Sequence, residues 1–154
     1  MSKSNTFEND ILKLIFNNVN IAGLGDATGV RGSSAAGSLY VSLCTGDPGE
    51  AGTQVTNEAA YTGYARVAVS RANDGSGWTV SGNSVSNTAA IAFPKCTGGS
   101  ETYTHFSIGY AASGATTVCY KGNLKDSGGT NTSLAVSANI IPQIDAGGAT
   151  ITED

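Results

Sequence analysis

Alternation of apolar and polar residues dominates residues 37–93. In the segment SLYVSLC, Leu39, Val41 and Leu43 alternate with small or polar neighbours. The segment at residues 64–70, YARVAVS, repeats this alternation. A period of two is typical of strands with one buried face. Both segments are therefore predicted to be strands of one antiparallel core.

Turn-forming residues follow both segments. Asp47-Pro48-Gly49 comes shortly after the first, and Asn73-Asp74-Gly75 comes after the second. Proline fixes φ for a turn, whereas glycine tolerates the positive φ that tight turns need. The Asn-Asp-Gly sequence suits a hairpin loop. It is predicted to return the chain into a further strand that contains Trp78 and Val80.

Further short alternating segments continue to the end of the chain, separated by glycine-rich turns. They are predicted near residue 85 and at residues 90–93, 102–110, 116–121, 133–136, 140–144 and 150–152. About nine short strands at this spacing indicate a sandwich or barrel rather than βαβ units. The predicted fold class is mainly β: an antiparallel, jelly-roll-like β-sandwich.

A different period occurs near the N-terminus. Asn5 followed by Glu8 resembles a helix capping box. Apolar residues then fall at helical spacing: Phe7, Ile11, Leu14, Ile15 and Phe16. A short helix is marginal alone and must dock on something. It either packs against the chain's own sheet or anchors the subunit to a neighbour, in which case these five residues form an assembly interface.

The domain prediction follows from these two patterns. Residues 1–36 are predicted to be a helix and a glycine-rich linker arm, and residues 37–154 a β-sandwich domain. The linker shows no sustained period. The linker is rich in glycine but does not contain the lysine of a phosphate-binding loop, so no nucleotide cofactor is predicted.

Composition and charge exclude several kinds of partner. Charged residues make up only 13% of the 154 residues, and the formal net charge is −4. Lysine and arginine are scattered singly, so no surface for binding nucleic acid is expected. No apolar run approaches the length of a membrane span, and no secretion signal is apparent. We expect the chain to fold in the cytoplasm.

The three cysteines indicate neither a metal site nor a disulfide framework. Cys44, Cys96 and Cys119 lie far apart without the spacing of zinc ligands, and their number is odd. They are predicted to be small apolar residues in or beside strands. No metal and no cofactor are predicted.

Candidate catalytic residues are few. His105 is the only histidine, so any nucleophilic triad would depend on it, and no G-x-S-x-G motif occurs. Asp47, Glu50 and Glu58 lie close in sequence and could hold calcium or act in glycoside hydrolysis, with Glu50 and Glu58 as the pair. Their spacing matches no metal motif. The sequence therefore predicts that the protein is not an enzyme.

Aromatic residues allow two interpretations. They could form a platform that stacks on sugar rings, or they could be ordinary core and interface anchors. The second interpretation is favoured because no Asp or Asn cluster accompanies the tyrosines in one loop. The residues concerned are Tyr61, Tyr64, Trp78, Tyr103, Tyr110 and Tyr120.

Several segments together resemble a family of small virion proteins of tailed bacteriophages, whose members are often labelled tail fibre proteins. They are FENDILKLIFN, GDATGVRGS, AAGSLYVSLCTGDPGEAG, NEAAYTGYARVAVSR, GWTVSGNSVSNTAAIAFP, CTGGSETYTHFSIG and ITED. The resemblance covers nearly the whole chain. It implies a structural component of the virion and brings no catalytic residues.

Two virion roles follow from the resemblance. The first is a capsid decoration (cement) protein that binds the major capsid protein or other virion proteins as a homo-oligomer, expected to be a trimer. The alternative is a tail tip or tail fibre component that binds host-surface glycans. Decoration is favoured because a fibre usually has an extended repetitive shaft. A glycan depolymerase is the rival from a different class.

Overall fold

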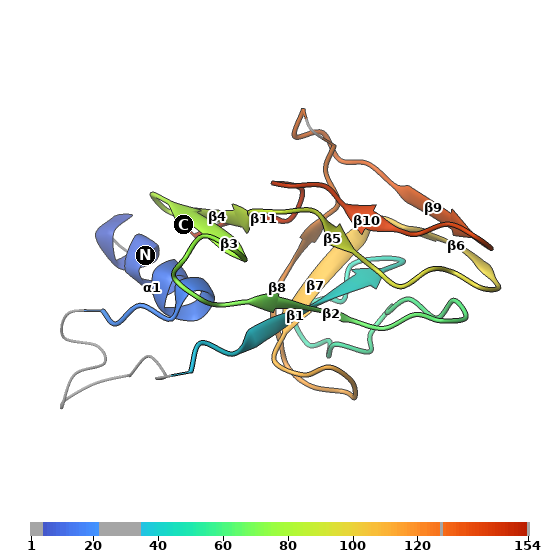
Figure 1. Ribbon diagram of the computed structural model, residues 1–154, viewed down its shortest axis with the longest axis horizontal. Helices are drawn as coiled ribbons and strands as arrows, with labels where there is room; N and C mark the ends of the chain where they lie inside the picture. The colour runs from blue at the N-terminus through green and yellow to red at the C-terminus, as the bar shows by residue number, and fades with distance from the viewer. Residues whose placement is uncertain (1–4, 22–34, 127, 154) are drawn as a thin grey trace.

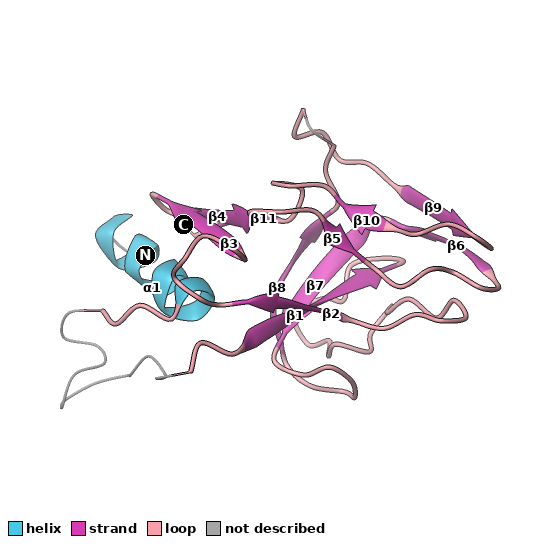
Figure 2. Ribbon diagram, viewed as in Figure 1, coloured by secondary structure: helices cyan, strands magenta, loops and turns pink. Residues whose placement is uncertain are grey.

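The computed structural model describes residues 5–21, 35–126 and 128–153, and it confirms the mainly β, antiparallel fold class. Figure 1 shows one short helix beside layered strands, and Figure 2 shows how much of the remaining chain is loop. The elements are α1 (Asn5–Asn17), β1 (Ser38–Cys44), β2 (Val67–Ser70), β3 (Trp78–Ser81), β4 (Ser84–Asn87), β5 (Ile91–Ala92), β6 (Ser100–Tyr103), β7 (His105–Gly109), β8 (Val118–Asn123), β9 (Leu134–Ser137), β10 (Gln143–Ile144) and β11 (Thr150–Thr152).

The strands form four antiparallel sheets. The central sheet has the order β2-β1-β7-β8, and a three-stranded sheet has the order β11-β4-β3. Two further pairs, β10-β5 and β6-β9, complete the set. In Figure 1 the β6-β9 pair lies at the end of the molecule opposite α1.

The core lies on one face of the central sheet. Leu39, Val41 and Leu43 of β1 are at most 1% exposed, as the alternation predicted. In the β1–β7 ladder Val41 pairs with Ile108 and Leu43 with Phe106, so all five side chains point to the same face. They join one cluster of buried residues that also includes Trp78, Phe16 and Ile151 from the elements at the helix end.

Helix α1 packs within the subunit. The ring of Phe16 lies 4.7 Å from that of Trp78 and 5.4 Å from that of Tyr120, centre to centre. The guanidinium of Arg71 donates hydrogen bonds to the carbonyls of Leu14 and Ile15 in the last turn. These contacts satisfy helix-end carbonyls that would otherwise lack partners.

The end of α1 has a local cause. Asn18 adopts a positive φ of 52°, and the N–H of Val19 donates to the carbonyl of Lys13 at 3.2 Å. Helices commonly end at a residue in the left-handed conformation, which asparagine tolerates better than most residues do. Among the described residues no helix is long and apolar enough to cross a membrane.

One predicted strand is interrupted. Residues 102–110 were expected to form a single strand, but the chain changes sheets at Thr104. Its N–H donates to the carbonyl of Cys44 at 3.1 Å, and its hydroxyl donates to the carbonyl of Thr45. The alternation of residues continues through Thr104, but the strand partners change there. Before it, β6 pairs with β9; after it, β7 pairs with β1 and β8.

Two other predictions also need correction. The Asn73-Asp74-Gly75 turn forms, but it joins β2 and β3 of different sheets and is no hairpin, because β3 pairs with β4 instead. Of residues 140–144, only Gln143 and Ile144 form a strand. Ile140 and Ile141 are exposed in the turn that precedes it.

The glycine-rich linker predicted near residues 20–37 falls largely outside the described residues. The division into an arm and a β domain stays a prediction. What the structure gives is the contact of the helix with β3 and β4.

Candidate functional site

The second face of the central sheet is also buried at its centre, although the residues there are small and mostly polar. Ser42 and Ser107 are cross-strand partners on this face, and both are 0% exposed, as is Cys44. Two long loops cover them. We call residues 45–66 and 110–117 together the loop layer.

A buried ion pair holds the two loops together. Nε of Arg66 lies 2.6 Å from Oε1 of Glu58, and Nη2 lies 2.8 Å from Oε2, which is a bidentate arrangement. The remaining guanidinium N–H groups donate to the carbonyls of Ala111 and Gly114, each at 3.0 Å. The Arg66 side chain is only 2% exposed. Hydrogen bonding to Glu58 raises the pKa of Arg66.

Glu58 has further partners on the same side. It accepts a hydrogen bond from the Tyr64 hydroxyl at 3.0 Å and lies opposite Cys44 in a single β-bridge. Burial raises the pKa of Tyr64 far above its usual value and that of Cys44 to about 11. The thiol is therefore protonated at neutral pH and is a poor nucleophile. Glu58 thus links Arg66, Tyr64 and the strand that contains Cys44.

Gln54 provides a second anchor, and it is 0% exposed. Its Oε1 accepts hydrogen bonds from the Thr116 hydroxyl and from the N–H of Ala111. Its backbone N–H donates to the carbonyl of Thr116 at 2.8 Å. A Cβ atom at Gly109 would lie 2.1 Å from Cδ of Gln54, so only glycine leaves room for this amide.

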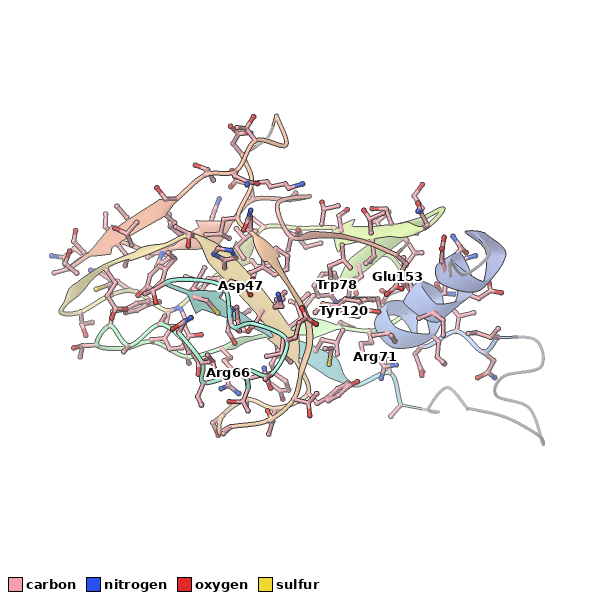
Figure 3. All side chains as sticks on the ribbon, turned by 180° about the vertical axis from the view of Figure 1, so that it is seen from behind. Asp47, Arg66, Arg71, Trp78, Tyr120 and Glu153 are labelled. Carbon is pink, nitrogen blue, oxygen red and sulfur yellow. The ribbon has the colours of Figure 1, made fainter. Side chains whose placement is uncertain are left out.

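A third anchor lies at the rim of the layer. Nζ of Lys121 is 2.9 Å from Asp47 and 3.2 Å from Glu50. The N–H of Gly49 and, after it, Lys121 lower the pKa of Asp47. The Asp47 and Glu50 carboxylates are 53% and 96% exposed, so water screens these pairs. In Figure 3 Arg66 lies apart from Trp78 and Tyr120, which are near α1.

The candidate catalytic residues Glu50, Glu58 and His105 have different surroundings in the structure. Glu58 is bound to Arg66, whereas Glu50 lies at the surface beside Lys121. His105 is half-buried, and its Nδ1 is hydrogen-bonded to the Thr104 hydroxyl at 2.8 Å. Within the described ranges no group of three His, Cys, Asp or Glu residues could hold a metal ion. Whether the protein has any catalytic activity stays a prediction.

The aromatic residues do not gather into a platform. Trp78, Tyr61 and Tyr103 are at most 3% exposed, and Tyr64 and Tyr120 pack against the core. Tyr110 is 62% exposed. It follows a register shift between Ile108 and Gly109, which ends the regular alternation of β7.

The candidate assembly residues of α1 have unequal positions. Phe16 is 0% exposed and contributes to the subunit's own core. Ile15 also packs against this core, whereas Ile11 and Leu14 are half-buried. The side chain of Phe7 lies outside the described residues. An assembly role for Ile11, Leu14 and Ile15 stays a prediction.

Sequence reasoning missed Arg66 and Gln54 as organising residues. Arg66 carried a usable signal, because it is the one charged residue in the alternating segment at residues 64–70 and follows Glu58 by eight positions. Gln54 lies in an irregular loop between turn residues. No periodic pattern marks it.

The geometry described above is that of a β framework on which polar contacts hold two long loops. Comparison with protein-family models then matches residues 2–152 to the family described as Podophage GP4 fiber I protein gp80. The chain belongs to this family, which confirms the resemblance to virion structural proteins of tailed phages. A search of curated proteins gave no significant match.

Proposed function

We propose that this protein is a subunit of a podophage virion fibre. The observation that carries the proposal is the match of residues 2–152 to a family whose description is a fiber protein. The fold is compatible with this role, because three sets of polar contacts hold the loop layer on the central sheet. Such anchoring preorganises surface loops for contact with other molecules.

Electron microscopy of virions labelled with a gold-conjugated antibody tests the proposal. Label confined to fibres or to the tail supports it. Label spread over the capsid contradicts it and supports the second candidate below. Particles from a phage that lacks the gene provide the control for antibody specificity.

Capsid decoration is the second candidate function. The observation that favours it is the lack of an extended repetitive segment among the described residues, which form short strands and loops around one core. In this role the partner would be the major capsid protein. The same labelling experiment separates the two candidates, and binding of purified protein to emptied capsids gives an independent measurement.

In either role we infer a homo-oligomer, with a trimer as the expected state. Ile11 and Leu14, half-buried on α1, are the residues that we expect a neighbouring copy to cover. Replacing both with serine is expected to shift the native mass from trimer to monomer while circular dichroism stays unchanged. Lys13→Ser, on the same helix, is the matched control. A wild-type protein that is monomeric at high concentration contradicts the inference.

We also infer that the protein acts by binding and assembly rather than by catalysis. The candidate catalytic carboxylates Glu58 and Glu50 are engaged by Arg66 and Lys121. Purified protein is expected to leave polysaccharide lawns intact. Clearing that Glu50→Gln or His105→Ala abolishes in a folded protein would contradict this inference.

A further inference from the structure

A wide, open cleft lies beside the loop layer, where β7 and β8 meet the segment that leads into β9. Its volume is about 510 Å³, within the range of small-molecule sites. It is lined by Thr104, His105, Asn123, Asn131, Thr132 and Ser133. Five of these six residues carry an uncharged hydroxyl or amide, and the sixth is the histidine.

Backbone hydrogen bonds fix the walls of the cleft. The N–H of Leu124 donates to the carbonyl of Thr104 at 2.9 Å, and the N–H of Thr132 donates to the carbonyl of Leu124 at 2.9 Å. His105 and Asn123 are cross-strand partners of β7 and β8 and so lie on one face. The three segments therefore form one hydrogen-bonded frame, and the cleft is preformed.

The polar groups in the cleft are largely uncommitted. Within the described part of the chain, the side chains of Asn123, Asn131 and Thr132 have no hydrogen-bond partner, and the same holds for Ser133. Each amide offers two donor hydrogens and an acceptor oxygen, and each hydroxyl can donate or accept. The cleft thus offers both kinds of hydrogen bond without a net charge.

The orientation of His105 adds a defined group. The hydroxyl of Thr104 donates its single proton to the carbonyl of Thr45 at 3.1 Å. Its bond with Nδ1 of His105 therefore has the ring nitrogen as donor. In a neutral ring this leaves Nε2 as a hydrogen-bond acceptor that is not used by Thr104.

We propose that this cleft binds a neutral saccharide unit of a host-surface glycan, an inference that rests on the proposed fibre function. Sugar hydroxyls donate and accept in equal measure, which matches amides, hydroxyls and an imidazole acceptor. An anionic ligand would find no cation among the lining residues, and an apolar ligand would leave their polar groups unpaired. Without an aromatic surface for stacking, one cleft binds weakly, and several copies on one particle raise the overall affinity.

Binding of the full-length protein, displayed in many copies on a biosensor surface, tests the proposal. The probes are maltotetraose, chitotetraose and galactotetraose, with dextran sulfate as the charged comparison. Saturable binding to at least one neutral probe is expected. Asn123→Ala and Asn131→Ala are each expected to weaken it about tenfold, the effect of losing one or two hydrogen bonds. Asn73→Ala and Ser113→Ala, at exposed positions in other loops, are the matched controls and are expected to change nothing.

Three outcomes overturn the proposal: no binding of any neutral probe, binding that the cleft variants do not weaken, or binding of dextran sulfate alone. A wild-type NMR titration keeps the test valid if a variant fails to fold, because the side-chain amide signals of Asn123 and Asn131 must shift with the bound saccharide. The fibre proposal is judged by the position of the antibody label on virions. If the label lies on fibres but no saccharide binds, only the assignment of the cleft is disproved.

Discussion

Both faces of the central sheet are buried at its centre, but they are covered in different ways. On one face, Phe106 and Ile108 pack against strands and helix α1 in a continuous apolar core. On the other, Ser107 lies beneath loops that Arg66 and Gln54 hold through directed hydrogen bonds. Hydrophobic burial is non-directional and tolerates rearrangement, whereas a buried polar network requires each partner in place. The first face supplies most of the stability, and the second fixes the position of the surface loops.

The largest effect is expected on the apolar face. Phe106→Ala should lower the free energy of unfolding by about 4 kcal/mol, because it removes a fully buried ring and leaves a cavity. Urea denaturation measures the change. Ile141→Ala, at a position that is 60% exposed, is the control and should cost less than about 0.5 kcal/mol. Similar costs for the two variants would contradict the assignment of this face as the core.

The ion pair of the loop layer gives the next largest effect. Arg66→Ala should lower the free energy of unfolding by about 3 kcal/mol, because it leaves the mostly buried carboxylate of Glu58 without its partner. The double variant Glu58→Ala/Arg66→Ala should be more stable than the sum of the two single variants predicts. Additive costs would show that the two side chains act independently. Arg66→Lys should not restore stability fully, since lysine cannot form the bidentate contact.

A smaller effect is expected at the junction of the sheet and the Gln54 anchor. Gly109→Ala should cost about 2 kcal/mol, because the new methyl group displaces the buried amide of Gln54. The cost should shrink in a Gln54→Ala background, where that amide is absent. Gly46→Ala, whose added Cβ would have its closest neighbour at 3.6 Å, is the control and should be nearly neutral. An undiminished cost in the double variant would place the clash elsewhere.

How much the sequence could predict differs between the two faces for a physical reason. The alternation of Leu39, Val41 and Leu43 correctly predicted the apolar face, because burial against a core selects apolar residues at every second position. The same alternation made the face of Ser42 look solvated. Small polar residues fit both water and a covering loop, so only the tertiary contacts reveal which is present.

The site residues were predictable only where a local rule applied. The helix and its end follow from apolar spacing and from Asn18, whereas Gln54 is positioned by residues about 60 positions later in the chain. The strand break at Thr104 likewise depends on partners in β1. The cleft around His105 and Asn123 needs the β7–β8 register together with the segment at residues 131–133. None of these distant pairings leaves a periodic signal.

The smallest effect on stability is expected at the rim of the loop layer. A comparison of Asp47 with Asp74 distinguishes the contribution of an ion pair from that of hydrogen bonds within a turn. The pKa of Asp47 is lowered by the N–H of Gly49 and by Lys121, and that of Asp74 by Ser76 without a cation. A folded-state pKa below the unfolded value of about 3.9 stabilises the protein above that pH, and the stabilisation is lost as the pH falls through the folded pKa. Asp47→Asn and Asp74→Asn should therefore each differ from wild type in unfolding midpoint near pH 6, and the difference should vanish under strong acid.

Salt then distinguishes the two aspartates. At about 1 M salt the screening length is about 3 Å, so the part of the Asp47 effect that comes from Lys121 should shrink. The Asp74 effect depends on hydrogen bonds within its own turn and should persist. Thermal unfolding of wild type and both variants, at low and high salt and at pH 6, gives the comparison. If the change in unfolding midpoint caused by Asp47→Asn is the same at low and high salt, the Gly49 N–H alone holds this loop and Lys121 contributes nothing to the rim of the layer.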